Sequence, residues 1–278
     1  MYGELTHIVE LFQFPFMQRA LLGGIMTGCT GGLLGSFTIL RQLSFFSDAL
    51  GHSALLGISL GLLFGINPSL ILLPFAIVFA LGVTYLLERT RLWTDALLNI
   101  IYSASLAIAI IILSFVGHYK GGLTNLLFGD ILAVGEMDLI ISGILLLITT
   151  IFIGLTVRIQ MLMTLCEPLA IARGVPVTIH RTVFIVLLSL VVGVSIKAIG
   201  VLLVSAFIVI PACTARLLSR RFFSYIPLSA GIGACSAVVG MVCSAAFNLP
   251  SGPSIVAIQL GFFLTATLRG LFTAQSPT

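Results

Sequence analysis

The chain has 278 residues, of which 59% are hydrophobic and only 8% are charged. A soluble globular domain carries about 25% charged residues, so this composition excludes a water-soluble fold and predicts an integral membrane protein. The net charge of +4 does not indicate a nucleic-acid partner, because the 13 basic residues lie mostly at the ends of apolar segments, where they orient a protein in the membrane.

Long apolar runs with short polar gaps predict an all-α, polytopic helical membrane protein with eight or nine transmembrane helices. At about 20 residues per span, nine segments follow one another along the chain: 18–40, 47–66, 69–88, 96–117, 137–158, 182–198, 200–219, 225–247 and 254–271. The stretch 182–219 can instead form one span and a broken helix, because only Lys197-Ala-Ile-Gly200 interrupts it. Residues 18–271 are expected to form a single transmembrane domain, after an interfacial segment at 1–17 and before a tail at 272–278.

The first predicted span carries glycines four residues apart, at 24, 28 and 32 and again at 31 and 35. Small residues at this spacing share one face of a helix and let the backbones of neighbouring helices approach closely in lipid. The pattern predicts a buried helix.

Asp48 and His52 lie one helical turn apart at the start of the second predicted span. A carboxylate and an imidazole at this spacing share one face of a helix. Ionisable groups are costly inside a membrane and usually mark substrate or proton handling. One oxygen ligand and one nitrogen ligand suit a borderline divalent metal. The alternative is a structural pair, in which the carboxylate fixes the imidazole or Arg41.

The segment 159–181 contains the sequence EPLAIARGVP at 167–176. Pro168 favours the start of a short helix, and Gly174-Val-Pro176 favours its end. A cytoplasmic helix of this kind is a candidate docking site for a partner, and an ordinary amphipathic loop is the alternative. With this segment inside, ten of the 13 basic residues also fall on the inner side. By the positive-inside rule, nine spans then place the N-terminus outside and the C-terminus in the cytoplasm.

Four stretches resemble, in order, the permease subunit of the ATP-binding-cassette importers that bring in zinc, manganese or ferrous iron. They are SDALGHSALLG at 47–57, AIARGVP at 170–176, AIGVLLVSAFIVIPACTARL at 198–217 and LPSGPSIV at 249–256. The likeness runs from about residue 15 to 270. One departure is Gly57, where the family often carries a proline.

The resemblance implies a homodimeric ABC importer permease with its pore between two copies. It implies that the family's metal-contacting residues fall on Asp48 and His52, which would form a transient transport site. It further implies an extracytoplasmic metal-binding protein and two cytoplasmic ATP-binding subunits. Those subunits would grip the docking segment at Glu167, Pro168, Ala172, Arg173, Gly174 and Pro176.

The function expected from the sequence is therefore ATP-driven import of a divalent metal ion across a bacterial cytoplasmic (inner) membrane. Overall likeness favours manganese, with zinc next, and the Asp–His pair favours a bare ion over an organic chelate. The chain lacks the P-loop pattern GxxxxGK[ST], so a partner must use the ATP. We expect no resident cofactor and no enzymatic activity in this chain.

Two other classes of function remain as alternatives. An ATPase-independent secondary transporter or channel for divalent metals would need paired broken helices and several intramembrane acids, but the predicted spans offer little beyond Asp48. An intramembrane metalloprotease would need an HExxH-type motif, which the sequence does not contain.

Overall fold

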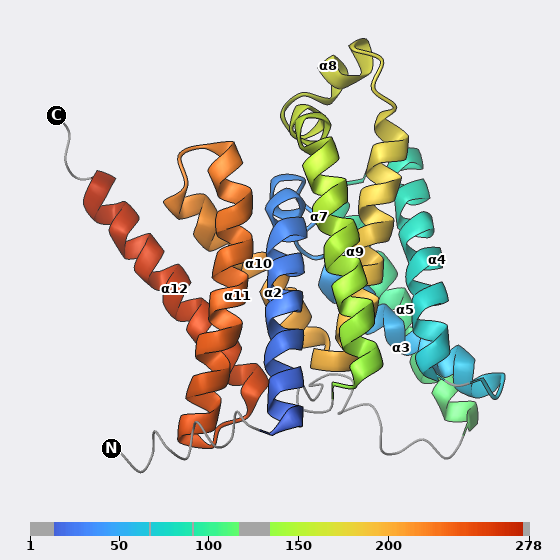
Figure 1. Ribbon diagram of the computed structural model, residues 1–278. Helices are drawn as coiled ribbons and strands as arrows, with labels where there is room; N and C mark the ends of the chain where they lie inside the picture. The colour runs from blue at the N-terminus through green and yellow to red at the C-terminus, as the bar shows by residue number, and fades with distance from the viewer. Residues whose placement is uncertain (1–13, 67, 91, 117–133, 275–278) are drawn as a thin grey trace.

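The computed structural model describes residues 14–66, 68–90, 92–116 and 134–274. Within these ranges every regular element is a helix (Figure 1). In chain order they are α2 (Pro15–Leu40), α3 (Phe46–Leu63), α4 (Pro68–Arg89), α5 (Thr94–Val116), α7 (Glu136–Leu165), α8 (Glu167–Ala172), α9 (Val177–Ile199), α10 (Val201–Leu218), α11 (Phe222–Phe247) and α12 (Ser251–Ala274).

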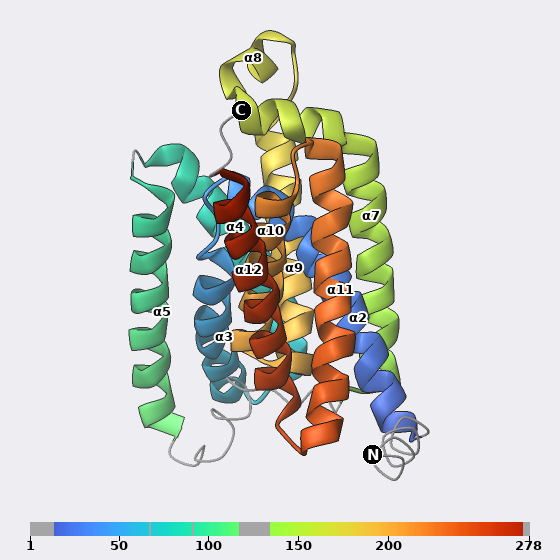
Figure 2. The ribbon, with the colours of Figure 1, turned by 90° about the vertical axis from the view of Figure 1, so that its left-hand side faces the viewer.

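Among the described residues, eight helices are long and apolar enough to cross a membrane, and the apolar stretch Leu203–Leu218 of α10 is shorter. This confirms the all-α membrane fold with eight or nine spans. The helix α2 starts at the end of the molecule opposite α8, and α12 ends on the same side as α8 (Figures 1 and 2). The two ends of the described bundle therefore lie on opposite faces.

Gly200 decides how residues 182–219 are divided, which the sequence alone did not determine. It separates α9 from α10 with φ 80° and ψ 162°, a backbone region that essentially only glycine adopts. Residues 182–219 consequently form two helices.

The predicted segment ends differ slightly from the observed helix ends. The helix α2 begins at Pro15, where a proline costs nothing because the first-turn N–H has no helical partner. Residues 15–17 of the expected interfacial segment are thus helical, and residues 1–13 lie outside the described residues. The helix α12 continues to Ala274, and the rest of the expected tail also lies outside them.

The helix α2 lies at the centre of the bundle, between α7, α10 and α11. Its glycines face backbone atoms of these neighbours: a Cβ added at Gly28 would lie 2.5 Å from the carbonyl oxygen of Gly233. One turn further on, Ser229 Oγ of α11 donates a 2.7 Å hydrogen bond to the carbonyl oxygen of Gly32. The glycine pattern therefore marks a tightly packed, buried helix, as the sequence predicted.

The apolar core surrounds α2, α3, α9 and α10, and its largest fully buried side chains are Phe37, Phe46, Phe184 and Phe207. Large apolar side chains of α4, α5, α7 and α12 remain exposed on the outer surface, as expected for helices that face lipid. The helix α3 packs against α4, α5, α9 and α10. This packing holds the Asp48–His52 segment inside the bundle.

Candidate functional site

Asp48 lies in the first turn of α3, half-buried, where the helix dipole stabilises a carboxylate. Ser205 Oγ of α10 donates a 2.6 Å hydrogen bond to Asp48 Oδ1. The same hydroxyl lies 3.2 Å from the carbonyl oxygen of Val201 in its own helix. Within the described part of the chain, Ser205 thus engages one of the two carboxylate oxygens of Asp48.

The close approach of α10 to α3 depends on Gly51, which lies between the two candidate ligands. A Cβ at this position would overlap the side chain of Val201, the first residue of α10. Because Gly51 lacks that atom, the two backbones come close enough for Ser205 to reach Asp48.

His52 is also half-buried, and its Nδ1 lies 2.9 Å from the backbone carbonyl oxygen of Asp48. A carbonyl oxygen only accepts, so this contact requires a proton on Nδ1 and leaves the Nε2 lone pair for a metal. The edge of the ring contacts Tyr102 of α5, with ring centroids 4.9 Å apart. The Asp48 carboxylate bonds Ser205, and Arg41 bonds α7.

An open cavity of about 640 Å³ adjoins Asp48, and its lining includes Asp95 and Asn99 of α5. These two residues were not predicted as site residues, although they repeat the i, i+4 polar spacing at the start of a predicted span. Asp48 and Asp95 both lie in the first turn of their helices. Within the described ranges, no group of three or more His, Cys, Asp or Glu residues is arranged to hold a metal.

The predicted docking segment forms the short helix α8, which projects from one end of the molecule (Figures 1 and 2). Pro168 lies in its first turn. Gly174 follows its last turn with φ 75°, and the N–H groups of Gly174 and Val175 bond the carbonyl oxygens of Ile171 and Ala170 at 2.9 and 3.1 Å. This is a Schellman cap, so the helix start and end expected from Pro168 and Gly174 are confirmed.

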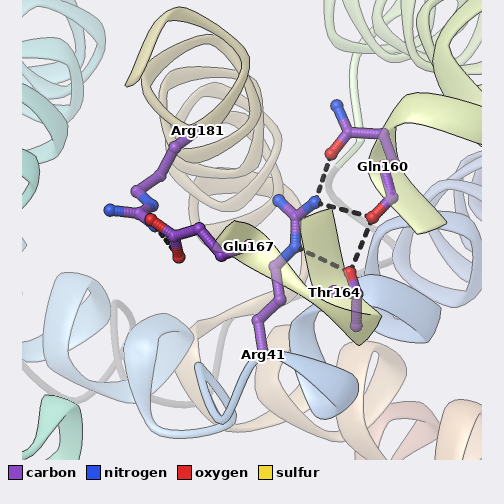
Figure 3. Close-up of polar contacts among 5 residues, drawn as sticks. All are labelled: Arg41, Gln160, Thr164, Glu167 and Arg181. Carbon is purple, nitrogen blue, oxygen red and sulfur yellow. Dashed lines mark hydrogen bonds and ion pairs between the residues drawn. The ribbon is translucent and has the colours of Figure 1, made fainter. Parts of the chain in front are cut away.

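The side chains predicted for docking lie mostly in solvent. Pro168, Ala172, Arg173, Gly174 and Pro176 are exposed. Glu167 is the half-buried exception, because Arg181 Nη2 of α9 donates to its carboxylate at 2.5 Å (Figure 3). The exposed surface of α8 is therefore available to a partner, while the ion pair ties its first turn to α9.

Arg41, the C-cap of α2, lies beside this ion pair and points its guanidinium towards the end of α7 (Figure 3). Its Nε donates to Thr164 Oγ1 at 3.2 Å, and its Nη2 donates to both the carbonyl and the side-chain oxygen of Gln160. The guanidinium carbon also lies 4.8 Å from the centroid of the Phe184 ring. Burial lowers the pKa of Arg41 to about 10, which leaves it charged at neutral pH.

These features define a polytopic membrane protein with an Asp–His pair in an apolar bundle and a short, exposed helix at one end. The chain belongs to the ABC 3 transport family, which it matches over residues 13–270. It is thus a membrane permease subunit of the metal-ion ABC importer type.

Similar proteins cover nearly the whole chain. The manganese transport system membrane protein MntC of Listeria monocytogenes is 32% identical, with 93% of this chain and 92% of the relative covered. The manganese import system permease protein ScaB of Streptococcus gordonii is 34% identical, with 93% of each covered. The high-affinity zinc uptake system membrane protein ZnuB of Haemophilus influenzae is 29% identical, with 92% and 98% covered.

A chain in the structure of PsaBC from Streptococcus pneumoniae in complex with Fab has a TM-score of 0.81 and 31% identity, with 94% of this chain and 95% of that one covered. An inward-facing putative metal-chelate type ABC transporter has a TM-score of 0.69 at 18% identity, with 91% and 85% covered. The second likeness is one of fold alone.

Proposed function

We propose that this chain is the membrane subunit of an ATP-driven importer for a bare divalent metal ion, and that Asp48 and His52 contact the ion in transit. The observation that carries the proposal is the geometry of this pair. In each side chain the protein binds one donor atom, Oδ1 of Asp48 and Nδ1 of His52. Nε2 of His52 and Oδ2 of Asp48, a residue that lines an open cavity, remain to bind a cation.

Two donors in one chain are fewer than the four that hold a structural zinc ion. Weak binding suits a transport site, since the ion must leave as readily as it enters. We propose that two copies form a homodimer in which both Asp48–His52 pairs face a shared pore. Such a site would offer two carboxylates and two imidazoles.

The proposed partners follow from the two ends of the bundle. Cytoplasmic ATP-binding subunits would bind the exposed residues of α8, and an extracytoplasmic metal-binding protein would deliver the ion at the opposite end. In this orientation the chain crosses the bacterial cytoplasmic (inner) membrane with its N-terminus outside and its C-terminus inside. The basic residues Arg89, Arg173, Arg216 and Arg221 then lie at cytoplasmic helix ends, as the positive-inside rule requires.

Manganese is the proposed cargo, with zinc second. Two of the relatives described above, at 32% and 34% identity, are named for manganese transport, and one at 29% is named for zinc. The ligand set by itself serves both metals, because one carboxylate and one imidazole are acceptable to each.

The proposal is tested with the permease reconstituted in liposomes with its ATP-binding subunits and metal-binding protein. We expect Asp48→Asn and His52→Gln each to reduce ATP-dependent manganese uptake at least about tenfold, since each removes a charged or coordinating group from the ion's path. Glu136→Gln and His180→Gln are the matched controls, because these residues lie at helix ends away from the cavity. Unchanged uptake in both site variants would refute the site.

The same assay distinguishes the ATP-driven importer from an ATPase-independent transporter or channel. Vesicles that contain the permease without any ATP-binding subunit should show no concentrative uptake. Uptake that persists in those vesicles would instead support a secondary transporter or channel.

A further inference from the structure

Arg41 joins two regions that lie far apart in the sequence. Its hydrogen-bond partners on α7, Gln160 and Thr164, are 119 and 123 positions away. Burying a guanidinium is costly unless its N–H groups find acceptors. Here Nε donates to Thr164 Oγ1, and Nη2 donates to the carbonyl and side-chain oxygens of a fully buried Gln160. The contact is therefore a specific, fork-shaped connection between the α2–α3 turn and the end of α7.

On one side, Arg41 is rigidly connected to the candidate transport site. The turn after α2 closes as a Schellman motif, in which the N–H of Leu43 bonds the carbonyl oxygen of Thr38 at 2.9 Å and Gln42 takes φ 57°. Leu43 is buried in the core. The turn is thus hydrogen-bonded and packed, and it joins Arg41 to the first turn of α3, where Asp48 lies.

On the other side, Arg41 is connected to the docking helix. Only Cys166 separates α7 from α8, and the buried side chains of Met163, Ala170 and Val177 form a small core of their own between α7, α8 and the start of α9. Gln160 and Thr164 occupy the last two turns of α7. The end of α7 and α8 should therefore move as one body.

We propose that Arg41 is a positioning residue for transport: it sets the first turn of α3, and with it Asp48, according to the position of α8. Movement of α8 by an ATP-binding subunit would pull on the guanidinium through Gln160 and Thr164, and the rigid turn would pass this movement to the Asp48–His52 segment. The inference rests on the proposed function, in which α8 is the docking site.

The first test measures the number of metal ions transported per ATP hydrolysed in the reconstituted complex. Arg41→Met keeps a long side chain but removes every donor, and Arg41→Lys keeps the charge but loses the planar fork. For Arg41→Met we expect ATP hydrolysis within about twofold of the parent and uptake reduced about tenfold or more, the size of effect expected for lost hydrogen bonds to a charged group. The number of ions transported per ATP in Arg41→Lys should lie between the values for the parent and for Arg41→Met.

Arg89→Met is the matched control. Arg89 ends α4, is exposed, and lies over the ring of Tyr85 at 5.6 Å in its own helix. This variant removes a guanidinium without touching α7, so its transport per ATP should equal that of the parent.

The second test follows the cavity directly. Asn99 lines the cavity and is exposed, so a thiol reagent can reach position 99 in an Asn99→Cys background, with modification at that position read by mass spectrometry. We expect the rate of thiol modification at position 99 to change when ATP is added to the complex. This ATP-dependent change should vanish when Arg41→Met is also present. A purely structural role for Arg41 would not remove an ATP-dependent difference.

The possible results separate the two proposals. Normal transport per ATP in Arg41→Met, or an unchanged ATP response at position 99, would overturn the role of Arg41 alone. The role of Arg41 would also be overturned if both Arg41 variants lost ATP hydrolysis and thermal stability together, because this combined loss indicates misfolding. Absence of ATP-driven uptake in the parent complex would overturn the proposed function itself, and the coupling role with it.

Discussion

Ser205 Oγ and Asp48 Oδ1 lie 2.6 Å apart and connect α10 to the first turn of α3 across 157 positions of sequence. Ser205 is nearly fully buried, so its hydroxyl has little access to water. The bond fixes the orientation of the carboxylate.

We predict that Ser205→Ala raises the manganese concentration for half-maximal uptake about tenfold, because a hydrogen bond to a charged group is worth about 1.5–3 kcal/mol. The maximal rate should change less, since Asp48 itself remains. Uptake of radiolabelled manganese over a range of concentrations measures both quantities. Ser205→Thr keeps the hydroxyl and should restore much of the affinity.

Ser59→Ala provides the control for that experiment. Ser59 is fully buried in the same helix as Asp48, and its hydroxyl donates a 2.8 Å hydrogen bond to the carbonyl oxygen of Leu56. If the Ser59 and Ser205 variants lose affinity equally, the loss comes from removing a buried hydroxyl and not from the carboxylate.

The cap of α8 gives a second prediction. Gly174 has φ 75°, and a Cβ at this position would meet nothing within 4 Å, so Gly174→Ala changes conformational strain without creating a clash. A non-glycine residue in this region costs about 1–2 kcal/mol, which should weaken binding of the ATP-binding subunits about fivefold or more. The dissociation constant of the detergent-solubilised complex measures this effect.

Gly154→Ala is the matched control for the cap. Gly154 lies inside α7 without a positive φ and also has open space around it. Alanine favours a helix interior, so this variant should bind the subunits as the parent does. Equal weakening in both variants would contradict a specific role for the α8 cap.

Local patterns were enough to predict the helices and several of their details. Apolar runs, the four-residue glycine spacing and the Pro168 and Gly174 signals each depend on residues within one or two turns, so a single sequence reveals them. The sequence did not decide whether the helix breaks at Gly200, because a continuous apolar run does not show which glycine takes a positive φ.

The environment of the candidate site could not be predicted in the same way. The contacts of Asp48 with Ser205 and of Arg41 with Gln160 join segments more than 100 residues apart, and one sequence carries no record of which distant helices meet. The cavity beside Asp95 and Asn99 likewise arises only when α3, α5 and α10 pack together. The role of Asp48 and His52 as metal ligands stays a prediction.

The packing of α2 yields a prediction about stability. Gly28→Ala would place a Cβ 2.5 Å from the carbonyl oxygen of Gly233. Relief of this clash requires the backbones of α2 and α11 to move apart, which costs packing energy. Overpacking of this kind costs about 1–3 kcal/mol, so the melting temperature in detergent should fall by about 5 °C. Gly231→Ala, where a Cβ meets nothing within 4 Å, should leave it unchanged. A similar fall in both variants would show that the close approach of α2 and α11 is not the cause.

Asp95 is predicted to raise the concentration of the ion within the cavity that it shares with Asp48. Its exposed carboxylate lies on the cavity wall, and a negative charge there raises the local concentration of cations. A charge contact worth about 1 kcal/mol in water implies that Asp95→Asn lowers the maximal uptake rate about fivefold at low ionic strength. Because salt screens exposed charges, the difference from the parent should shrink as ionic strength rises.

The control for this effect is Glu88→Gln, which removes an exposed carboxylate near the α8-side end of α4, outside the cavity lining. Uptake rates measured at low and high salt then compare two single-charge changes that differ only in position. A salt-independent defect in Asp95→Asn would point to direct coordination or altered packing. An equal defect in Glu88→Gln would mean that net surface charge, and not the cavity, governs the rate.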